Sequence, residues 1–347
     1  MDAVLTAMVE EKIGPGERNR LLIQTVKEQL RFDYALALRS PAVALHLALK
    51  ALALSPGKAV VISALSPYYY LQVIKDLQLT PLFCDITNDF PCMNREMIQE
   101  TINKKPPECE VCAVVLHHTL GFVPDTPSIA ELGIPVIEDI SQSYGSWLKP
   151  GVKKDQEESK EAPAPSASAQ VSFSGVFCIL GLEERDMLTS GGGALLFAMN
   201  RRDGTLLRNY TSIADEFCLP DINAALAVVQ FRELQRNIER RNEIAQIYAH
   251  AGLRTRHKRF IPKKDDENNY YSFSLILETG LKDVVLYAKK KEIILENAFE
   301  KSIAGIEPCA GCPVSNSLVL RTVLFPFFPR LRSQEIERVS RLIMTLP

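Results

Sequence analysis

The chain alternates short apolar runs with segments of helical spacing, and this alternation limits its possible folds more than any other feature. Apolar residues recur at helical spacing over residues 42–53, 68–77 and 94–102. Strand-like apolar runs lie at residues 59–65, 81–86, 111–121 and 134–139. Strands that are apolar on both faces are buried between helices, so we predict an α/β protein with a mostly parallel sheet.

The second half of the chain predicts a smaller α/β unit joined to the first by a long helix. Residues 174–180 and 192–199 continue the strand pattern, and residues 220–250 form a helical segment that begins with proline and aspartate. We therefore expect a large domain over residues 1–235 and a small C-terminal α/β domain over residues 236–347.

Residues 149–170 have a different composition from the rest of the chain. They are rich in charge, proline, alanine and serine and hold almost no large apolar side chain. Such a segment cannot bury enough apolar surface to fold, so we expect a disordered surface insertion.

The charge balance and the N-terminus limit the partners and the compartment. The 40 basic and 42 acidic residues leave a net charge of -2, which does not direct the protein to nucleic acid or to anionic lipid. The acidic N-terminus lacks an export signal, and charged residues interrupt the apolar region at residues 34–54, so no membrane span is expected. We expect a cytoplasmic protein whose partner is a small polar ligand or another protein.

Two of the cysteine pairs have CxxC spacing. Cys109 with Cys112 and Cys309 with Cys312 belong to a set of eight cysteines, which we expect to be reduced thiols. A zinc site would need the two pairs to converge in space, and their separation far exceeds that of a zinc ribbon. We predict no metal site. A metal or redox protein that works through the two CxxC pairs is an additional hypothesis.

Several segments, taken in order, resemble the DegT/DnrJ/EryC1/StrS family of nucleotide-sugar aminotransferases. They are residues 44–62, 133–146, 190–197, 221–248 and 312–343. The resemblance covers most of the chain and implies the type I fold of pyridoxal-phosphate (PLP) transferases. It also implies that Asp139 lies at the ring nitrogen of the cofactor and that Gln142 contacts the ring hydroxyl. An alternative is that Asp139 is an inherited strand-end residue with a new partner.

The same resemblance exposes a missing lysine. These aminotransferases hold PLP as a Schiff base on a lysine. Counting back from the glycine turn puts Glu184 at that position, and counting forward from the strand puts Glu183 there. Because no lysine occurs from residue 161 to residue 257, a small shift of alignment does not supply an amine.

The implied phosphate contacts are altered as well. The family's Ser-Gly-Thr falls on residues 40–42, where Pro41 removes an N–H donor and is also a good first residue for a helix. Glu216 replaces an asparagine that reaches the partner's phosphate across the dimer. Pro67 takes the place of the ring-stacking aromatic, with the tyrosines of residues 68–70 directly after it.

These substitutions lead to two main hypotheses. The first is a degenerate family member that is inactive in PLP-dependent transamination, needs no cofactor, and is a homodimer or a heterodimer with an active relative in nucleotide-sugar metabolism. The second is an enzyme: either an active PLP-dependent sugar aminotransferase, or a PLP-independent enzyme for nucleotide sugars that uses Asp139, the glutamates and His118. His118, or its neighbour His117, is the candidate general base.

Overall fold

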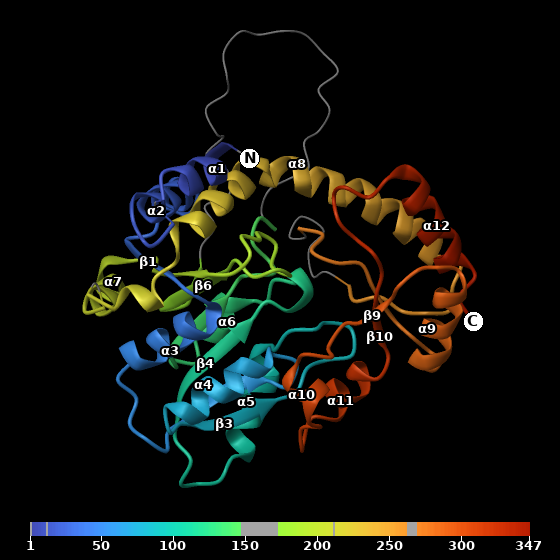
Figure 1. The fold of residues 1–347 in the computed structure, drawn as a ribbon. Coiled ribbons are helices and arrows are strands. Elements are labelled where there is room, and N and C mark those ends of the chain that lie inside the picture. The colour runs from blue at the N-terminus through green and yellow to red at the C-terminus, as the bar shows by residue number, and fades with distance from the viewer. Residues whose placement is uncertain (1, 12, 147–172, 211, 262–268) are drawn as a thin grey trace, which may run out of the picture.

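A computed structural model describes residues 2–11, 13–146, 173–210, 212–261 and 269–347 (Figure 1). The insertion predicted at residues 149–170 therefore lies outside the described residues. None of the helices in the described part of the chain combines enough length with enough apolar residues to cross a membrane.

The large domain is built on a seven-stranded sheet whose order is β1-β7-β6-β5-β4-β2-β3. The strands are β1 (Tyr34–Leu38), β2 (Ala59–Ser63), β3 (Thr80–Cys84), β4 (Val111–His117), β5 (Val136–Asp139), β6 (Phe177–Gly181) and β7 (Ala194–Ala198). Only β7 runs antiparallel to its two neighbours within this sheet. The predicted α/β fold with a mostly parallel sheet is therefore confirmed.

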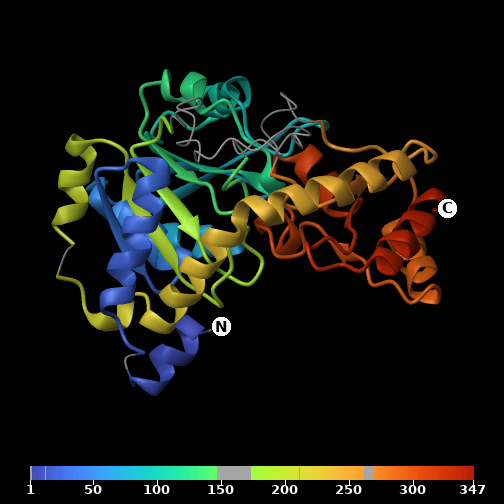
Figure 2. The same cartoon turned by 90° about the horizontal axis from the view of Figure 1, so that it is seen from above.

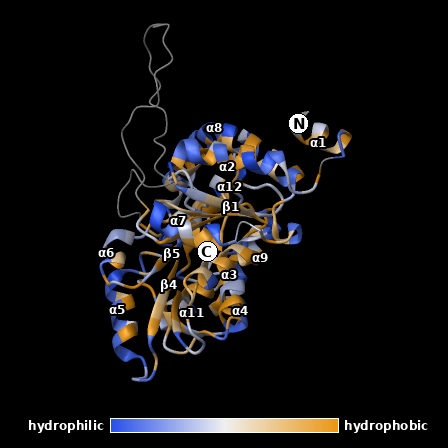
Figure 3. Cartoon of the chain, turned by 90° about the vertical axis from the view of Figure 1, so that its left-hand side faces the viewer, coloured by the Kyte–Doolittle hydropathy of each residue, from blue (hydrophilic) through white to orange (hydrophobic). Residues whose placement is uncertain are grey.

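Helices cover both faces of this sheet because its strands are apolar on both sides. Leu36, Ile179 and Leu196 pack on one face with α3 (Pro41–Ala51) and α4 (Tyr68–Asp76). Ala37 and Leu180 face the other way. Their core is completed by α2 (Glu17–Leu30) and the first part of α8 (Asp221–Gly252). The peripheral helices are α1 (Asp2–Val9), α5 (Arg95–Lys104), α6 (Thr126–Ala130) and α7 (Arg201–Arg208). Figure 3 shows apolar strands and helices with one apolar and one polar side.

The helix α8 crosses from one core to another (Figure 2). Its early residues, up to Ile238, belong to the core of the large sheet, whereas Ile244 and Tyr248 belong to a separate apolar cluster. That cluster covers the antiparallel sheet β8-β10-β9, with β8 (Ser274–Ile276), β9 (Glu296–Asn297) and β10 (Thr322–Leu324). The helices α9 (Leu281–Lys290) and α12 (Ser333–Met344) complete it.

Two short helices near the C-terminus pack on the core of the large sheet. They are α10 (Ile303–Ile306) and α11 (Pro313–Val319). The backbone N–H of Ala304 donates at 2.9 Å to the carbonyl of Ala64, the residue directly after β2. The loop between these helices holds the second CxxC pair and lies against the carboxyl end of β3.

Candidate functional site

The candidate site lies at the carboxyl ends of β4, β5 and β6, the place where ligands gather in open α/β sheets. Asp139 is the last residue of β5 and pairs in register with His117, the last residue of β4. Ile179 of β6 is its partner on the other side and belongs to the core beneath α3 and α4. Asp139 therefore points toward the α4 side of the sheet.

Internal donors occupy both carboxylate oxygens of Asp139. Tyr70 donates its hydroxyl to Oδ2 at 2.6 Å and Tyr69 donates to the same oxygen at 3.2 Å. The backbone N–H of Ser141 donates to Oδ1 at 3.0 Å, and the Ser141 hydroxyl donates to Oδ1 as well. Asp139 is 1% exposed, so these bonds replace its contact with water.

The tyrosines reach Asp139 from the first turn of α4, which begins directly after Pro67. Their rings meet edge to face with centroids 4.9 Å apart, and Tyr70 is fully buried. Burial and the nearby Asp139 carboxylate raise the pKa of both hydroxyls well above the ordinary value. Both tyrosines therefore stay protonated and donate to Asp139. Tyr69 and Tyr70, which closely follow the position of the ring-stacking aromatic, act here as hydrogen-bond donors.

The two neighbouring histidines point to opposite faces of the sheet. The His117 ring lies on the Asp139 side, edge to face with Tyr70 at 6.1 Å between centroids. Burial lowers the pKa of His117 to about 4, so its ring is neutral near pH 7. His118 lies on the other side, where Nδ1 is 2.7 Å from the Ser143 hydroxyl and Nε2 is 3.4 Å from Glu138 Oε2.

Gln142 supports the turn that follows β4. Its side-chain oxygen accepts from the backbone N–H of Leu120 at 2.7 Å. Leu120 has a φ of 56°, in the left-handed region, and this bond helps to hold it there. Gln142, which is half-buried and lies three residues after Asp139, thus has an internal hydrogen-bond partner.

The two glutamates assigned to the lysine position lie just beyond β6 and differ in environment. Glu184 is exposed, whereas Glu183 is half-buried and accepts from the backbone N–H of Gly193 at 3.4 Å. Asp186 follows them and accepts from the backbone N–H of Glu183 at 2.8 Å. Burial, and then repulsion from the Asp139 carboxylate, raise the pKa of Asp186 to about 8. Sequence reasoning missed Asp186, because nothing local distinguishes it from a surface acid.

Asp186 should make stability depend on pH, and Asp186→Asn should remove that dependence. The folded pKa is about 8 against 3.8 for the ordinary carboxyl, so the folded state keeps a proton that the unfolded state has lost. This contribution is fully present below pH 3.8 and is lost as the pH rises to about 8. The lowered pKa of His117 makes stability rise with pH between about 4 and its ordinary pKa of 6.5, which opposes the effect of Asp186. The effect of Asp186 on stability is therefore clearest between pH 6.5 and 8.

Urea unfolding across that window measures the effect. The wild type should lose about 1 kcal/mol of stability per pH unit relative to Asp186→Asn. Glu184→Gln, which changes an exposed neighbour, is the matched control and should follow the wild type. Parallel curves for the wild type and Asp186→Asn would contradict the assigned environment of Asp186.

The segment that the resemblance implies for phosphate binding forms the start of the helix α3. The Ser40 hydroxyl accepts from the backbone N–H of Val43 at 3.3 Å and caps α3. Pro41 is the first residue of that helix and is buried. Glu216 is exposed, and its carbonyl accepts from Arg39 Nε at 3.2 Å.

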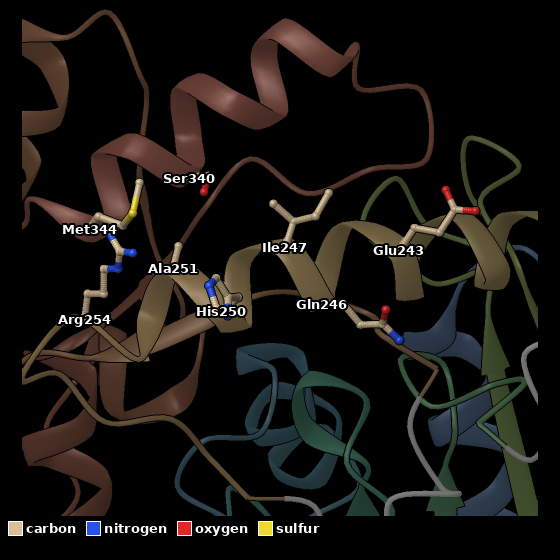
Figure 4. A pocket seen from close by; sticks show the side chains of 8 residues that line it. All are labelled: Glu243, Gln246, Ile247, His250, Ala251, Arg254, Ser340 and Met344. Carbon is tan, nitrogen blue, oxygen red and sulfur yellow. The ribbon is translucent and has the colours of Figure 1, made fainter.

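The candidate site is separate from a surface groove on the long helix α8. A groove of about 510 Å³ lies between α8 and α12 (Figure 4). It is lined by Glu243, Gln246, Ile247, His250, Ala251, Arg254, Ser340 and Met344. None of the candidate site residues borders this groove. Within the described residues, no group of three or more His, Cys, Asp or Glu side chains is placed to hold a metal ion.

Comparisons with known proteins agree with this fold along the whole chain. An aminotransferase of the DegT/DnrJ/EryC1/StrS family from Brucella abortus has a TM-score of 0.82 and 19% identity, over 99% of this chain and 93% of that one. UDP-N-acetyl-3-dehydro-alpha-D-glucosamine 3-aminotransferase of Acidithiobacillus ferrooxidans is 22% identical, over 94% of this chain and 88% of the relative. GDP-perosamine synthase of Escherichia coli O157:H7 is 25% identical, over 89% and 84%.

The family model gives the same assignment independently of any single relative. The model of the DegT/DnrJ/EryC1/StrS aminotransferase family matches residues 1–344, which is nearly the full length of the chain. The match includes the strand end at Asp139 and the glycine turn after β6. The chain therefore belongs to the DegT/DnrJ/EryC1/StrS aminotransferase family.

Proposed function

We propose that this family member does not transaminate through a Schiff base and acts as a binding or regulatory subunit in nucleotide-sugar metabolism. The observation that carries the proposal is the pair of tyrosine hydroxyls on Asp139. The family resemblance implies that this carboxylate receives the ring nitrogen of the cofactor. In this chain the side chains of α4 supply its donors.

The residues of the site do not fit PLP held in the manner of the family. Glu183 and Glu184 stand where the resemblance requires a lysine, and a carboxylate forms no imine. Ser40 uses its hydroxyl to cap its own helix. We therefore derive no catalytic step through this cofactor.

A subunit role follows from what the chain retains. The apolar residues of the large sheet and of the α2–α8 layer form continuous clusters, whereas the lysine and the phosphate contacts that the resemblance implies are replaced. A fold that keeps its packing but lacks the reactive lysine is better suited to binding than to transamination. We propose that the chain pairs either with a second copy or with an active family member, and that a nucleotide sugar is its ligand.

A second candidate is an enzyme for nucleotide sugars. The comparisons favour it, because the matching relatives are named as an aminotransferase and a GDP-perosamine synthase. A PLP-independent version would use acid–base groups on the Asp139 side of the sheet. His117 lies on that side, whereas His118 is buried against Ser143 and Glu138.

Incubation with excess PLP followed by borohydride separates the two candidates. We expect no absorbance band of an imine and no adduct at a single lysine by peptide mass spectrometry. The curated relative GDP-perosamine synthase, treated in parallel, is the positive control. A stable adduct on one lysine, together with amino transfer to a keto sugar nucleotide, would overturn the proposal and establish the enzyme.

A further inference from the structure

The second CxxC pair occupies a tight turn. The backbone N–H of Cys312 donates to the carbonyl of Cys309 at 3.3 Å, and Gly311 has a φ of 79°. These values describe a type II β-turn with Gly311 at its third position. The ends of such a turn have Cα atoms less than about 7 Å apart, within the range that a disulfide spans.

Side chains around the turn fix the two cysteines. Asn316 accepts from the backbone N–H of Cys309 at 3.0 Å and donates to its carbonyl at 2.9 Å. Asp85 accepts from the backbone N–H groups of Val314 and Ser315, at 2.9 and 2.8 Å, just after Cys312. Cys309 and Cys312 are 5% and 1% exposed, whereas Gly311 at the tip of the turn is exposed.

The other CxxC pair has a different backbone and provides an internal control. Cys109 ends a turn, with its N–H donating to Pro106, and Cys112 lies in β4. An extended backbone carries residues three apart to roughly 10 Å, beyond the reach of a disulfide. Both cysteines are nevertheless more accessible than Cys309 and Cys312.

We propose that Cys309 and Cys312 form a reversible intrachain disulfide by exchange with a low-molecular-weight disulfide. One cysteine thiolate attacks the small disulfide, which releases one small thiol and leaves a mixed disulfide on the protein. The second cysteine, as its thiolate, then attacks the mixed disulfide at the protein sulfur and releases the other small thiol. Two protein thiols are oxidised and one small disulfide is reduced to two thiols.

The surroundings of the pair set the rate of this exchange. Burial raises the pKa of Cys309 to about 11 and that of Cys312 to about 12. The thiolate is the nucleophile, so its small population near neutral pH makes the reaction slow. Between pH 7 and 9 the rate should rise about tenfold per pH unit, as the thiolate fraction does.

The test uses the full-length protein, first reduced and then incubated with oxidised glutathione at graded pH. After alkylation and digestion, mass spectrometry should find the peptide of Cys309 and Cys312 closed by one disulfide. Cys109 and Cys112 should instead carry separate glutathione adducts. In Cys309→Ser, Cys312 should accumulate a stable mixed disulfide, because the second attack is lost.

Two results would overturn the proposal. The first is stable glutathione on Cys309 or Cys312 of the wild type without ring closure. The second is complete modification of Cys109 and Cys112 while the Cys309 and Cys312 thiols remain free at pH 9. Both readings come from the wild-type protein, so they do not depend on whether a serine variant folds.

Discussion

Replacing Asp221 with alanine is expected to lower the free energy of unfolding by about 3 kcal/mol, since hydrogen bonds to a buried carboxylate are among the strongest in proteins. Asp221 is 4% exposed and stands at the start of α8. Its carboxylate accepts from the backbone N–H groups of Gly16, Arg18 and Asn19 at 2.9, 3.0 and 3.1 Å. It therefore satisfies the free N–H groups at the start of α2 and joins two helices that are distant in sequence.

Chemical denaturation of the purified variant measures this loss. Asp283→Ala is the matched control, because Asp283 is an exposed acid in the first turn of α9. We expect that control to change stability by less than about 0.5 kcal/mol. Equal, small effects of the two substitutions would mean that the joint between α2 and α8 does not depend on Asp221.

Asp221 also illustrates how far the sequence predicts this fold. Proline followed by aspartate marks the start of a long helix, and the structure places that start at Asp221. The partners of its carboxylate lie about 200 residues earlier, in a helix that the apolar pattern did not reveal. Local patterns predict elements, whereas contacts of this range depend on the packing of the whole chain.

The sheet was predictable because its strands are buried on both faces and therefore appear as unbroken apolar runs. The antiparallel direction of β7 could not be predicted, because parallel and antiparallel strands of a buried sheet have similar composition. In the C-terminal sheet, the sequence pattern overestimates the length of the first strand. Residues 270–277 are apolar or aromatic except for Ser272 and Ser274, yet only Ser274–Ile276 pairs as a strand.

At the site, the sequence located the strand end but not the partners. The resemblance to the family selected Asp139, at the end of a predicted strand. The choice between His117 and His118 needed the register of β4 on β5, because neighbouring strand residues face opposite sides. To identify the tyrosines as donors to Asp139, one must know how α4 lies over the sheet. No local sequence pattern gives that placement.

The role of Asp139 as an internal anchor has a direct energetic consequence. Asp139→Ala is expected to lower the free energy of unfolding by about 3 kcal/mol at pH 6.5, because the hydroxyls of buried Tyr70 and half-buried Tyr69 and the Ser141 N–H lose their acceptor. At this pH Asp186 keeps its proton, so relief of repulsion does not offset the loss. Denaturation of Asp139→Ala, Tyr70→Phe and the double variant gives the coupling energy between the two groups.

We expect that coupling to be about 1 to 2 kcal/mol, the range for a buried hydrogen bond to a charged group. A carboxylate kept for ligand binding behaves differently, because its oxygens have no internal donors until the ligand binds. Its removal then changes the free energy of unfolding of the ligand-free protein little. If Asp139→Ala leaves stability unchanged and shows no coupling to Tyr70, the tyrosines do not secure the carboxylate. Asp139 would then be open to a ligand, and the enzymatic candidate would be favoured over the subunit.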